Sequence, residues 1–309
     1  MIVTLTPNPS IDRTITVPQL AVGEVNRALG SRVDPGGKGV NVARALVRNG
    51  AEALAVRPLG GPDGAWMAQA LKADGVPHHV VAIPEDTRTN VAIVDADGET
   101  TKVNEPGPAL RADDTAALAA AIPEDASFVA LCGSLPAGTD PDFLPALVRR
   151  FRGRAVVDTS GEPLARAVAQ GPALIKPNAE ELAELVGREL LTIGDVVDAA
   201  RSLVASGVGV VVASLGADGA LWVDADDLVF AHATVEHPLS TVGAGDCLLA
   251  GVLGALDAGK GPEQALRQGV AWGAASVSLP GSAVPGPEDI ARTTVRSTTE
   301  PDLGTTLTH

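Results

Sequence analysis

The sequence predicts an α/β fold: a doubly wound, mostly parallel sheet with helices on both faces, plus a small separate β-sheet. Three observations predict it. Short β-branched apolar runs alternate with segments of helical period. Most of these runs are apolar throughout, as in strands that are buried on both faces. Two stretches of polar and apolar alternation interrupt this order, and the 309 residues, 45% of them hydrophobic, suffice for one large domain.

The predicted elements of the main domain follow one another in strand–helix order. Six apolar runs are predicted as strands of the main sheet: Ile2–Leu5, Ala53–Pro58, Phe128–Leu131, Ala155–Val157, Ala173–Ile175 and Val208–Ala213. Seven segments, several of which stop at Gly or Asn-Gly, are predicted as helices: Val40–Arg48, Gly64–Ala73, Leu164–Ala169, Ala179–Val186, Asp195–Ala205, Ala244–Leu256 and Glu263–Leu279.

The two interrupting stretches are residues 11–34 and 87–104, which we predict as strands of the small second sheet, outside the main one. The second contains an Asp97-Gly98 pair between alternating segments, which is typical of a hairpin turn. No linker divides the chain, so residues 1–292 are predicted as one domain. Residues 293–309 are rich in Thr and Ser with little apolar pattern, and we expect a flexible tail there.

Composition excludes several classes of protein. The net charge of −15, with 38 acidic and 23 basic residues, argues against binding nucleic acid, which needs a basic stripe. The most apolar stretch, Cys247–Leu256, is far shorter than the roughly 20 residues of a membrane span. Two cysteines are too few for a disulfide framework, so we expect a cytoplasmic protein. The five histidines lack the spacing of a zinc site.

The segment Ser240–Asp246 joins an extended run of small residues to an apolar helix. The first N–H groups of such a helix lack intrahelical acceptors, and the helix dipole favours negative charge there. Because Gly243, Ala244 and Gly245 carry little side chain, an anion can approach these N–H groups closely. An anion site beside Asp246 indicates phosphoryl transfer, with Asp246 taking the proton of the attacking hydroxyl. The alternative is an ordinary glycine-rich turn before a helix.

A second glycine turn, Asp34–Ala43, also opens a helix and carries Lys38 and Asn41. It lacks the spacing of a Walker A loop. Lys38 can hold a phosphate as a point charge, and Asn41 can bind hydroxyl groups. The alternative is a tight turn with a solvated lysine. The chain has five lysines, and Lys38, Lys102 and Lys176 fall in such motifs, so an anion site could be locally basic despite the acidic total.

Two further loops follow predicted strands, at the sheet edge where open α/β sheets bind ligands. In Lys176–Leu182, Asn178 has the position of an N-cap and Glu181 that of its capping-box partner. The functional alternative places both near Mg²⁺ and its waters. Ser214–Ala220 follows the strongest apolar run and contains two glycines; it is either a ligand loop or an ordinary turn.

Five segments in this order resemble the PfkB-type (ribokinase-like) carbohydrate kinases: Thr6–Asp12, Gly36–Asn41, Cys132–Pro136, Lys176–Leu182 and Ser240–Asp246. The resemblance extends to about residue 290 and is greatest to the sugar-phosphate kinases of that family. It implies ATP-dependent phosphorylation of a ketohexose monophosphate, most of all fructose 1-phosphate to fructose 1,6-bisphosphate. Tagatose 6-phosphate and fructose 6-phosphate are alternative acceptors, and a non-catalytic sugar-phosphate sensor is the alternative from another class.

The resemblance also implies roles for individual residues. Asp246 would be the general base, and Gly243, Ala244 and Gly245 the anion hole. The residues that it implies for the acceptor are Asp12, Gly37, Lys38, Asn41, Arg88 and Ser134. Those that it implies for ATP are Lys176, Asn178, Ser214, Gly216, Asp218 and Gly219. Glu181 would hold Mg²⁺ through water, and K⁺ would be a further cation. The small second sheet would be a lid over the sugar and would form a homodimer contact.

Overall fold

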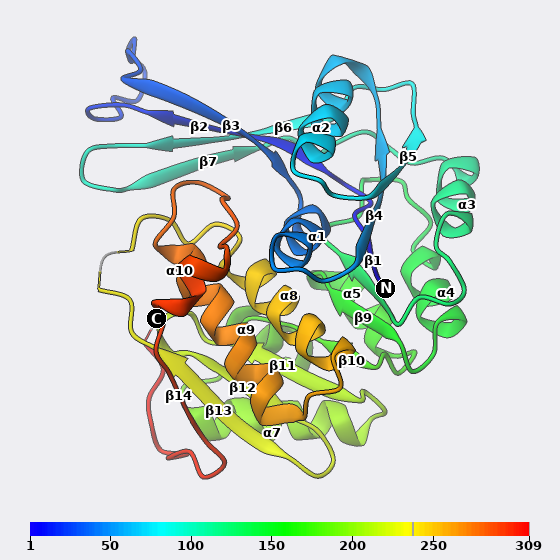
Figure 1. The fold of residues 1–309 in the computed structure, drawn as a ribbon, viewed down its shortest axis with the longest axis vertical. Coiled ribbons are helices and arrows are strands. Elements are labelled where there is room, and N and C mark those ends of the chain that lie inside the picture. Colours follow the sequence, from blue (N-terminus) through cyan, green and yellow to red (C-terminus); the bar gives the residue numbers. More distant parts are fainter. Residues whose placement is uncertain (237, 309) are drawn as a thin grey trace.

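The computed structural model describes residues 1–236 and 238–308, in which the strands form a sheet of ten and a separate sheet of four (Figure 1). In spatial order, the main sheet consists of β14 (Val295–Thr298), β13 (Leu228–Ala233), β12 (Ala220–Val223), β11 (Val210–Ser214), β10 (Leu174–Ile175), β9 (Ala155–Asp158), β8 (Phe128–Cys132), β1 (Ile2–Leu5), β4 (Ala53–Leu59) and β5 (His78–Ala82). Strands β5 through β11 are parallel, and β12, β13 and β14 continue the sheet antiparallel.

Helices cover both faces of the main sheet and enclose two apolar cores. The first core contains residues from α1 (Lys38–Arg48), α2 (Gly61–Ala73), α8 (Ala244–Asp257) and α9 (Pro262–Val277). The second contains residues from α3 (Ala112–Ala120), α4 (Phe143–Arg150), α5 (Gly161–Val168), α6 (Ala179–Val186) and α7 (Ile193–Ala205). A short helix, α10 (Pro287–Ala291), follows α9. Burial on both faces explains why β1 and β9 are apolar along nearly their whole length.

The order of the strands reverses at β1, which lies between β4 and β8. The chain first builds the sheet outward through β4 and β5, and then returns to β8 and builds in the other direction. The carboxyl ends of β1 and β8 therefore diverge at a topological switch point, which is where open α/β sheets bind their ligands. The helices α1 and α8 begin beside this point. The two glycine turns that open these helices therefore lie there too.

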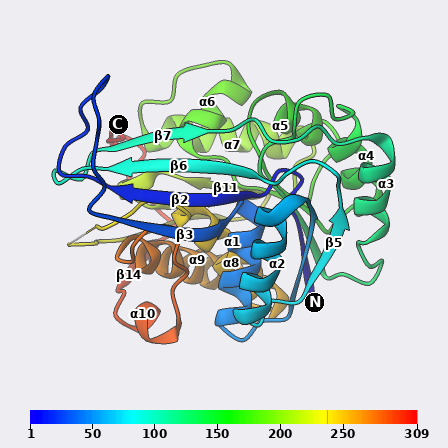
Figure 2. The ribbon, with the colours of Figure 1, turned by 90° about the horizontal axis from the view of Figure 1, so that it is seen from above.

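The second sheet consists of β3 (Gly30–Gly36), β2 (Ser10–Thr16), β6 (Arg88–Val94) and β7 (Thr100–Asn104), in that spatial order. Figures 1 and 2 show it extending from the α/β body above the start of α1, with the strands of both predicted stretches side by side. β2 pairs in parallel with β6 and antiparallel with β3, and β6 and β7 form the predicted hairpin. The predicted lid sheet is thus confirmed, with residues 17–29 as a loop between β2 and β3.

All six predicted strands of the main sheet are present, within a few residues of their predicted bounds. The sequence did not indicate β5, β12 or β13, nor the helices α3 and α4. The structure also differs from the flexible tail expected over residues 293–309. Residues 295–298 form β14, which pairs with β13, and Leu307 is buried in the second core. Residue 309 of that tail lies outside the described residues. Among the described residues, no helix has both the length and the apolar character to cross a bilayer.

Candidate active site

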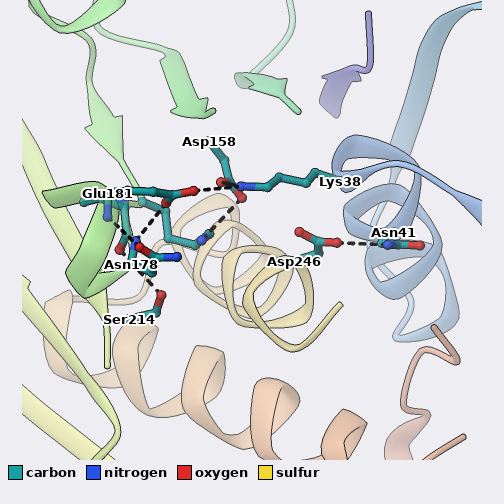
Figure 3. A network of polar contacts seen from close by, with 9 residues as sticks. Lys38, Asn41, Asp158, Asn178, Glu181, Ser214 and Asp246 are labelled. Carbon is teal, nitrogen blue, oxygen red and sulfur yellow. Dashed lines mark hydrogen bonds and ion pairs between the residues drawn. The ribbon is translucent and has the colours of Figure 1, made fainter. Parts of the chain in front are cut away.

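Asp246 lies in the first turn of α8, where Gly243 is the N-cap with a φ of 80°. That backbone conformation favours glycine, and it directs the N–H groups of the first turn away from the helix. Among the described residues, the N–H groups of Gly245 and Asp246 have no backbone acceptor. The carboxylate of Asp246 is only 7% exposed and accepts a hydrogen bond of 2.9 Å from Asn41 Nδ2 (Figure 3). The predicted base and the predicted hydroxyl ligand therefore meet at the switch point.

Burial raises the pKa of Asp246 to about 6, and the negative charge of nearby Asp158 acts in the same direction. The hydrogen bond from Asn41 and the charges of Lys38 and Lys176 lower it, but they do not outweigh burial. A carboxylate with a pKa near 6 is a stronger base than an exposed one and is still ionised at neutral pH. This matches what a proton acceptor needs.

A buried group of charges lies next to Asp246. Asp158, at the end of β9, is fully buried and lies 2.7 Å from Lys38 Nζ through Oδ1 and 3.5 Å from Lys176 Nζ through Oδ2 (Figure 3). Burial by itself would raise the pKa of Asp158, but the charges of Lys176 and Lys38 outweigh it and lower that pKa. Burial likewise opposes the charge on Lys38, yet Asp158 and Glu181 raise the pKa of this lysine above its ordinary value. Lys38 is therefore held as a cation beside the start of α8, and Lys176 Nζ lies beside the other oxygen of Asp158.

Asp158 is the site residue that the sequence did not indicate. Its signal is weak: one acidic residue directly after the apolar run Ala155–Val157. The register of the sheet supplies what the sequence lacks, since Asp158 is the parallel neighbour of Cys132 at the carboxyl end of β8. An acid at that edge of a central strand faces the ligand crevice.

Asn178 and Glu181 form the capping box that their spacing predicts at the start of α6. Asn178 Oδ1 accepts from the N–H of Glu181 at 2.7 Å, and Glu181 Oε2 accepts from the N–H of Asn178 at 2.9 Å. The second oxygen of Glu181 lies 3.6 Å from Lys38 Nζ, so one carboxylate caps the helix and faces the charge group. Ser214 pairs with Asn178 as a β-bridge, which joins the end of β11 to this turn (Figure 3).

The loop after β11 contains the short 3₁₀ turn η1 (Gly216–Asp218). Gly219 has a φ of 112°, and a Cβ there would collide with the carbonyl of Ala231, so packing requires this glycine. A Cβ on Gly216 would meet open space. Asp218 accepts two hydrogen bonds of 2.7 Å from Thr308, which the sequence did not indicate. Ser214 thus lies beside the turn at Asn178, whereas the side chain of Asp218 is turned to Thr308.

Asp12 lies on the lid, in β2, and lines a cavity of about 610 Å³ between the lid and residues 238–242 and 280–282. Ser10 Oγ and Asn90 Nδ2 donate to it at 2.7 and 3.3 Å. Burial raises the pKa of Asp12, although these hydrogen bonds oppose the change. The described lining also includes Asn90, Lys102 and Ser240. It reaches Val242, one residue before the N-cap of α8, so the lid cavity leads to the turn that precedes Asp246.

The other predicted acceptor residues lie around the root of the lid. Arg88 donates to the backbone carbonyls of Glu105 and Asn8 at 2.8 and 3.1 Å, and Ser134 Oγ accepts from Asn8 Nδ2 at 3.1 Å. Asn8, which we had not singled out, thus connects two predicted residues. Gly37 has a φ of 109°, which favours glycine there. Arg88 and Ser134 are not among the described residues that line the cavity beside Asp12.

Within the described residues, no group of three or more His, Cys, Asp or Glu side chains has the arrangement of a metal site. Two of the five histidines, His237 and His309, lie outside the described residues. The carboxylates of Asp158 and Glu181 both face Lys38 Nζ, and they offer two oxygen donors at the edge of the crevice.

Comparison with known proteins gives one consistent result. The family model of the pfkB family carbohydrate kinases matches residues 6–289. The chain is 39% identical over 298 residues to the 1-phosphofructokinase of Rhodobacter capsulatus, covering 94% of each chain. It is 37% identical over 283 residues to the ATP-dependent 6-phosphofructokinase isozyme 2 of Escherichia coli, covering 89% of this chain and 92% of the relative.

Solved structures agree with these relatives. The crystal structure of phosphofructokinase-2 from Escherichia coli in complex with substrates and products superimposes with a TM-score of 0.89 at 35% identity, covering 94% of this chain and 97% of the other. The same enzyme has also been solved in complex with potassium, with a TM-score of 0.88 at 35% identity and the same coverage. The likeness therefore includes both sheets and the helices between them.

Proposed function

Since the chain belongs to the pfkB family of carbohydrate kinases, which are ATP-dependent phosphotransferases, we propose that it is a 1-phosphofructokinase. It would transfer the γ-phosphoryl group of ATP to the C6 hydroxyl of fructose 1-phosphate. Relatives of that name at 39% identity, from Rhodobacter capsulatus and from Haloferax volcanii, support this acceptor. The observation that carries the catalytic part is the buried carboxylate of Asp246, placed beside free N–H groups at the start of α8.

In this proposal Asp246 accepts the proton of the C6 hydroxyl while that oxygen attacks the γ-phosphorus. The N–H groups of Gly245 and Asp246 and the positive end of the α8 dipole stabilise the charge on the transferred group. Lys176 supports this role, because a Cβ on Gly245 would lie 3.3 Å from its ammonium nitrogen. Lys38 is already a cation in the protein, so it can neutralise phosphate oxygens without first gaining a proton, and Lys176 Nζ lies 3.5 Å from the buried carboxylate of Asp158.

The oxygen donors of Asp158 and Glu181 suit Mg²⁺, which is held in nucleotide sites by one or two carboxylates, substrate phosphates and waters. These two residues would therefore hold the metal, and Glu181 would act through water. When bound, Mg²⁺ neutralises charge on the phosphates of ATP. The protein itself keeps Lys38 between the same two carboxylates, so it limits the repulsion between them.

We also propose that two copies associate through their lids. The loop between β2 and β3 carries exposed apolar side chains, Val22, Val25 and Leu29, and β7 adds Val103. These exposed apolar side chains on the lid and its connecting loop support a contact with another chain there. Light scattering after size exclusion should give a mass of twice 31.2 kDa. Val25→Asp should shift it toward one chain, and a monomeric wild-type protein would contradict this contact.

The test of the function is a panel of acceptors with ATP and Mg²⁺, followed by ADP release. We expect fructose 1-phosphate to give a higher kcat/KM than fructose 6-phosphate or tagatose 6-phosphate. The 37% identical 6-phosphofructokinase makes fructose 6-phosphate the main competitor. A preference for fructose 6-phosphate would support the kinase activity but would replace fructose 1-phosphate as the acceptor. Binding of a sugar phosphate with no ADP release would instead indicate the sensor.

A further inference from the structure

Residues 299–308, which we call the strap, run from β14 to the loop that follows β11. They hold to the start of α7 by backbone hydrogen bonds: Ile193 N–H to Thr305 at 2.9 Å, and Gly194 N–H to Leu303 at 2.9 Å. A Cβ on Gly194 would lie 2.9 Å from the carbonyl oxygen of Leu303, so this close approach requires glycine. Leu307 is buried in the second core. The strap is therefore attached to the fold at several points by backbone hydrogen bonds and by Leu307, while most of its other residues are exposed.

At Thr308 the strap contacts the loop after β11. We call this loop, residues 214–219, the nucleotide loop. Thr308 N–H donates to Asp218 Oδ2 and Thr308 Oγ1 donates to Asp218 Oδ1, both at 2.7 Å. Hydrogen bonds to a carboxylate are among the stronger ones in proteins. Within the loop, Leu215 N–H donates to Gly219 at 2.8 Å and Asp218 N–H to Leu215 at 3.1 Å. The hydrogen bonds from Thr308 thus stabilise a loop that is otherwise held mainly by hydrogen bonds within its own tight turn.

The position of this contact follows from the topology. Helix α7 precedes β11 and runs back along the sheet, so its first turn lies at the carboxyl edge of β11, beside the nucleotide loop. The strap crosses that edge from α7 to Asp218. The family match stops at residue 289, so both β14 and the strap lie beyond the part that this chain shares with the family model. In Figure 1, β14 is the red strand at the edge of the main sheet.

We propose that the strap holds the nucleotide loop in the conformation that binds ATP, and that Thr308 and Asp218 are positioning residues for this purpose. This inference rests on the proposed function, in which Ser214, Gly216 and Gly219 border the ATP site. It also changes the role predicted for Asp218: both oxygens of its carboxylate are engaged by Thr308, so it acts on the nucleotide through the loop. A loop that is already ordered loses less conformational entropy when it binds its ligand.

The variant that tests it is Thr308→Val, which removes the Oγ1 donor and keeps the shape. We expect the KM for ATP to rise about threefold to tenfold, as for the loss of one hydrogen bond. The KM for the sugar phosphate and kcat should not change. Thr308→Ser should restore the wild-type KM. Thr299→Val is the matched control, because Thr299 is exposed and makes no side-chain hydrogen bond within the described residues.

A double-mutant cycle separates positioning from direct contact. If Asp218 acts through Thr308, then Asp218→Asn combined with Thr308→Val should raise the KM for ATP little more than the worse single variant. If the increases in the KM for ATP of the two single variants multiply in the double variant, Asp218 contacts the nucleotide itself. This result would overturn the inference. A loss of thermal stability with an unchanged KM for ATP would also overturn it, since it would show a merely structural strap.

A measurement without turnover keeps this result distinct from the test of the function. Amide hydrogen exchange of residues 215–219 should be faster in Thr308→Val and in Gly194→Ala than in the wild-type protein. ATP titration should show the same weaker binding. An inactive wild-type protein that binds ATP would contradict the proposed kinase and leave the strap supported by these two readouts. An active wild type whose variants show unchanged exchange and ATP affinity would contradict the strap alone.

Discussion

The charge group beneath the crevice and the lid above it are built in different ways. Beneath the crevice, Lys38, Asp158 and Lys176 neutralise one another in the protein alone, and Asp158 and Lys176 are almost completely buried. On the lid, β7 is exposed throughout and β6 is half-buried. The buried Oδ1 of Asn90 has no partner among the described residues. The charges of the first region are paired before any ligand arrives, whereas the second region is more exposed and leaves Asn90 without a full set of partners.

This difference predicts where each region should affect the reaction. Preorganised charges and a fixed base lower the barrier of the chemical step, so changes beneath the crevice should reduce kcat or stability. Groups that find their partners only in the complex contribute to binding, so changes on the lid should raise KM. The four predictions below test that division in order of decreasing effect.

The largest effect is expected for Asp246→Asn. Because the amide cannot take the hydroxyl proton, kcat should fall at least about 10³-fold, more than a general base alone contributes, since Asp246 also aligns the hydroxyl. Steady-state kinetics with saturating substrates measures it. The matched control is Asp257→Asn, at the exposed other end of α8. Near-normal turnover in a folded Asp246→Asn protein would refute the assignment.

Asp158→Asn should have the largest effect on stability. It leaves the buried ammonium of Lys176 and that of Lys38 without their carboxylate. Removing one partner of a buried ion pair destabilises a protein by about 3–5 kcal/mol. Urea unfolding measures the change. Asp142→Asn, which breaks an exposed ion pair with Arg149, is the control and should leave the unfolding midpoint where it is. Equal midpoints for both variants would mean that the buried group is not neutralised as described.

Asp12→Asn should affect binding more than turnover. Its carboxylate lines the lid cavity, and a hydrogen bond from a sugar hydroxyl to it is replaced by a weaker one to an amide. We expect the KM for the sugar phosphate to rise about tenfold, the loss of about 1.4 kcal/mol, with a smaller change in kcat. Asp97→Asn, at the exposed tip of the β6–β7 hairpin, is the control. A large fall in kcat at constant KM would place Asp12 with the catalytic group instead.

Features that are local in sequence were predicted in both regions. The turn before α8 was predictable because glycines and an acid at a strand–helix junction are local in sequence, and Asp246 and Asn41 do meet there. The capping box at Asn178 was predictable because it is local in sequence. The lid sheet was visible in its alternating pattern and its Asp-Gly turn.

Contacts between distant segments were not predictable in this way. Asp158 joins the site only because the register places the end of β9 beside β8. Asp218 accepts from Thr308, 90 residues away, and neither residue has a neighbour in sequence that indicates the other. The Thr-rich composition of residues 293–309 predicted a flexible tail, but edge pairing of β14 with β13 and burial of Leu307 outweigh that local tendency.

The smallest effect concerns pH. Burial raises the pKa of Asp246 to about 6, and the base works only when ionised, so kcat/KM should fall as the pH drops through about 6. Phosphate groups of the substrates also titrate near pH 6, so the comparison of two proteins is the decisive measurement. Asn41→Ala removes the hydrogen bond that lowers the pKa of Asp246, and should therefore move the acidic limb to higher pH. The substrates titrate identically with both proteins, so any displacement belongs to the protein. An acidic limb at the same pH in both would mean that a group other than Asp246 controls it.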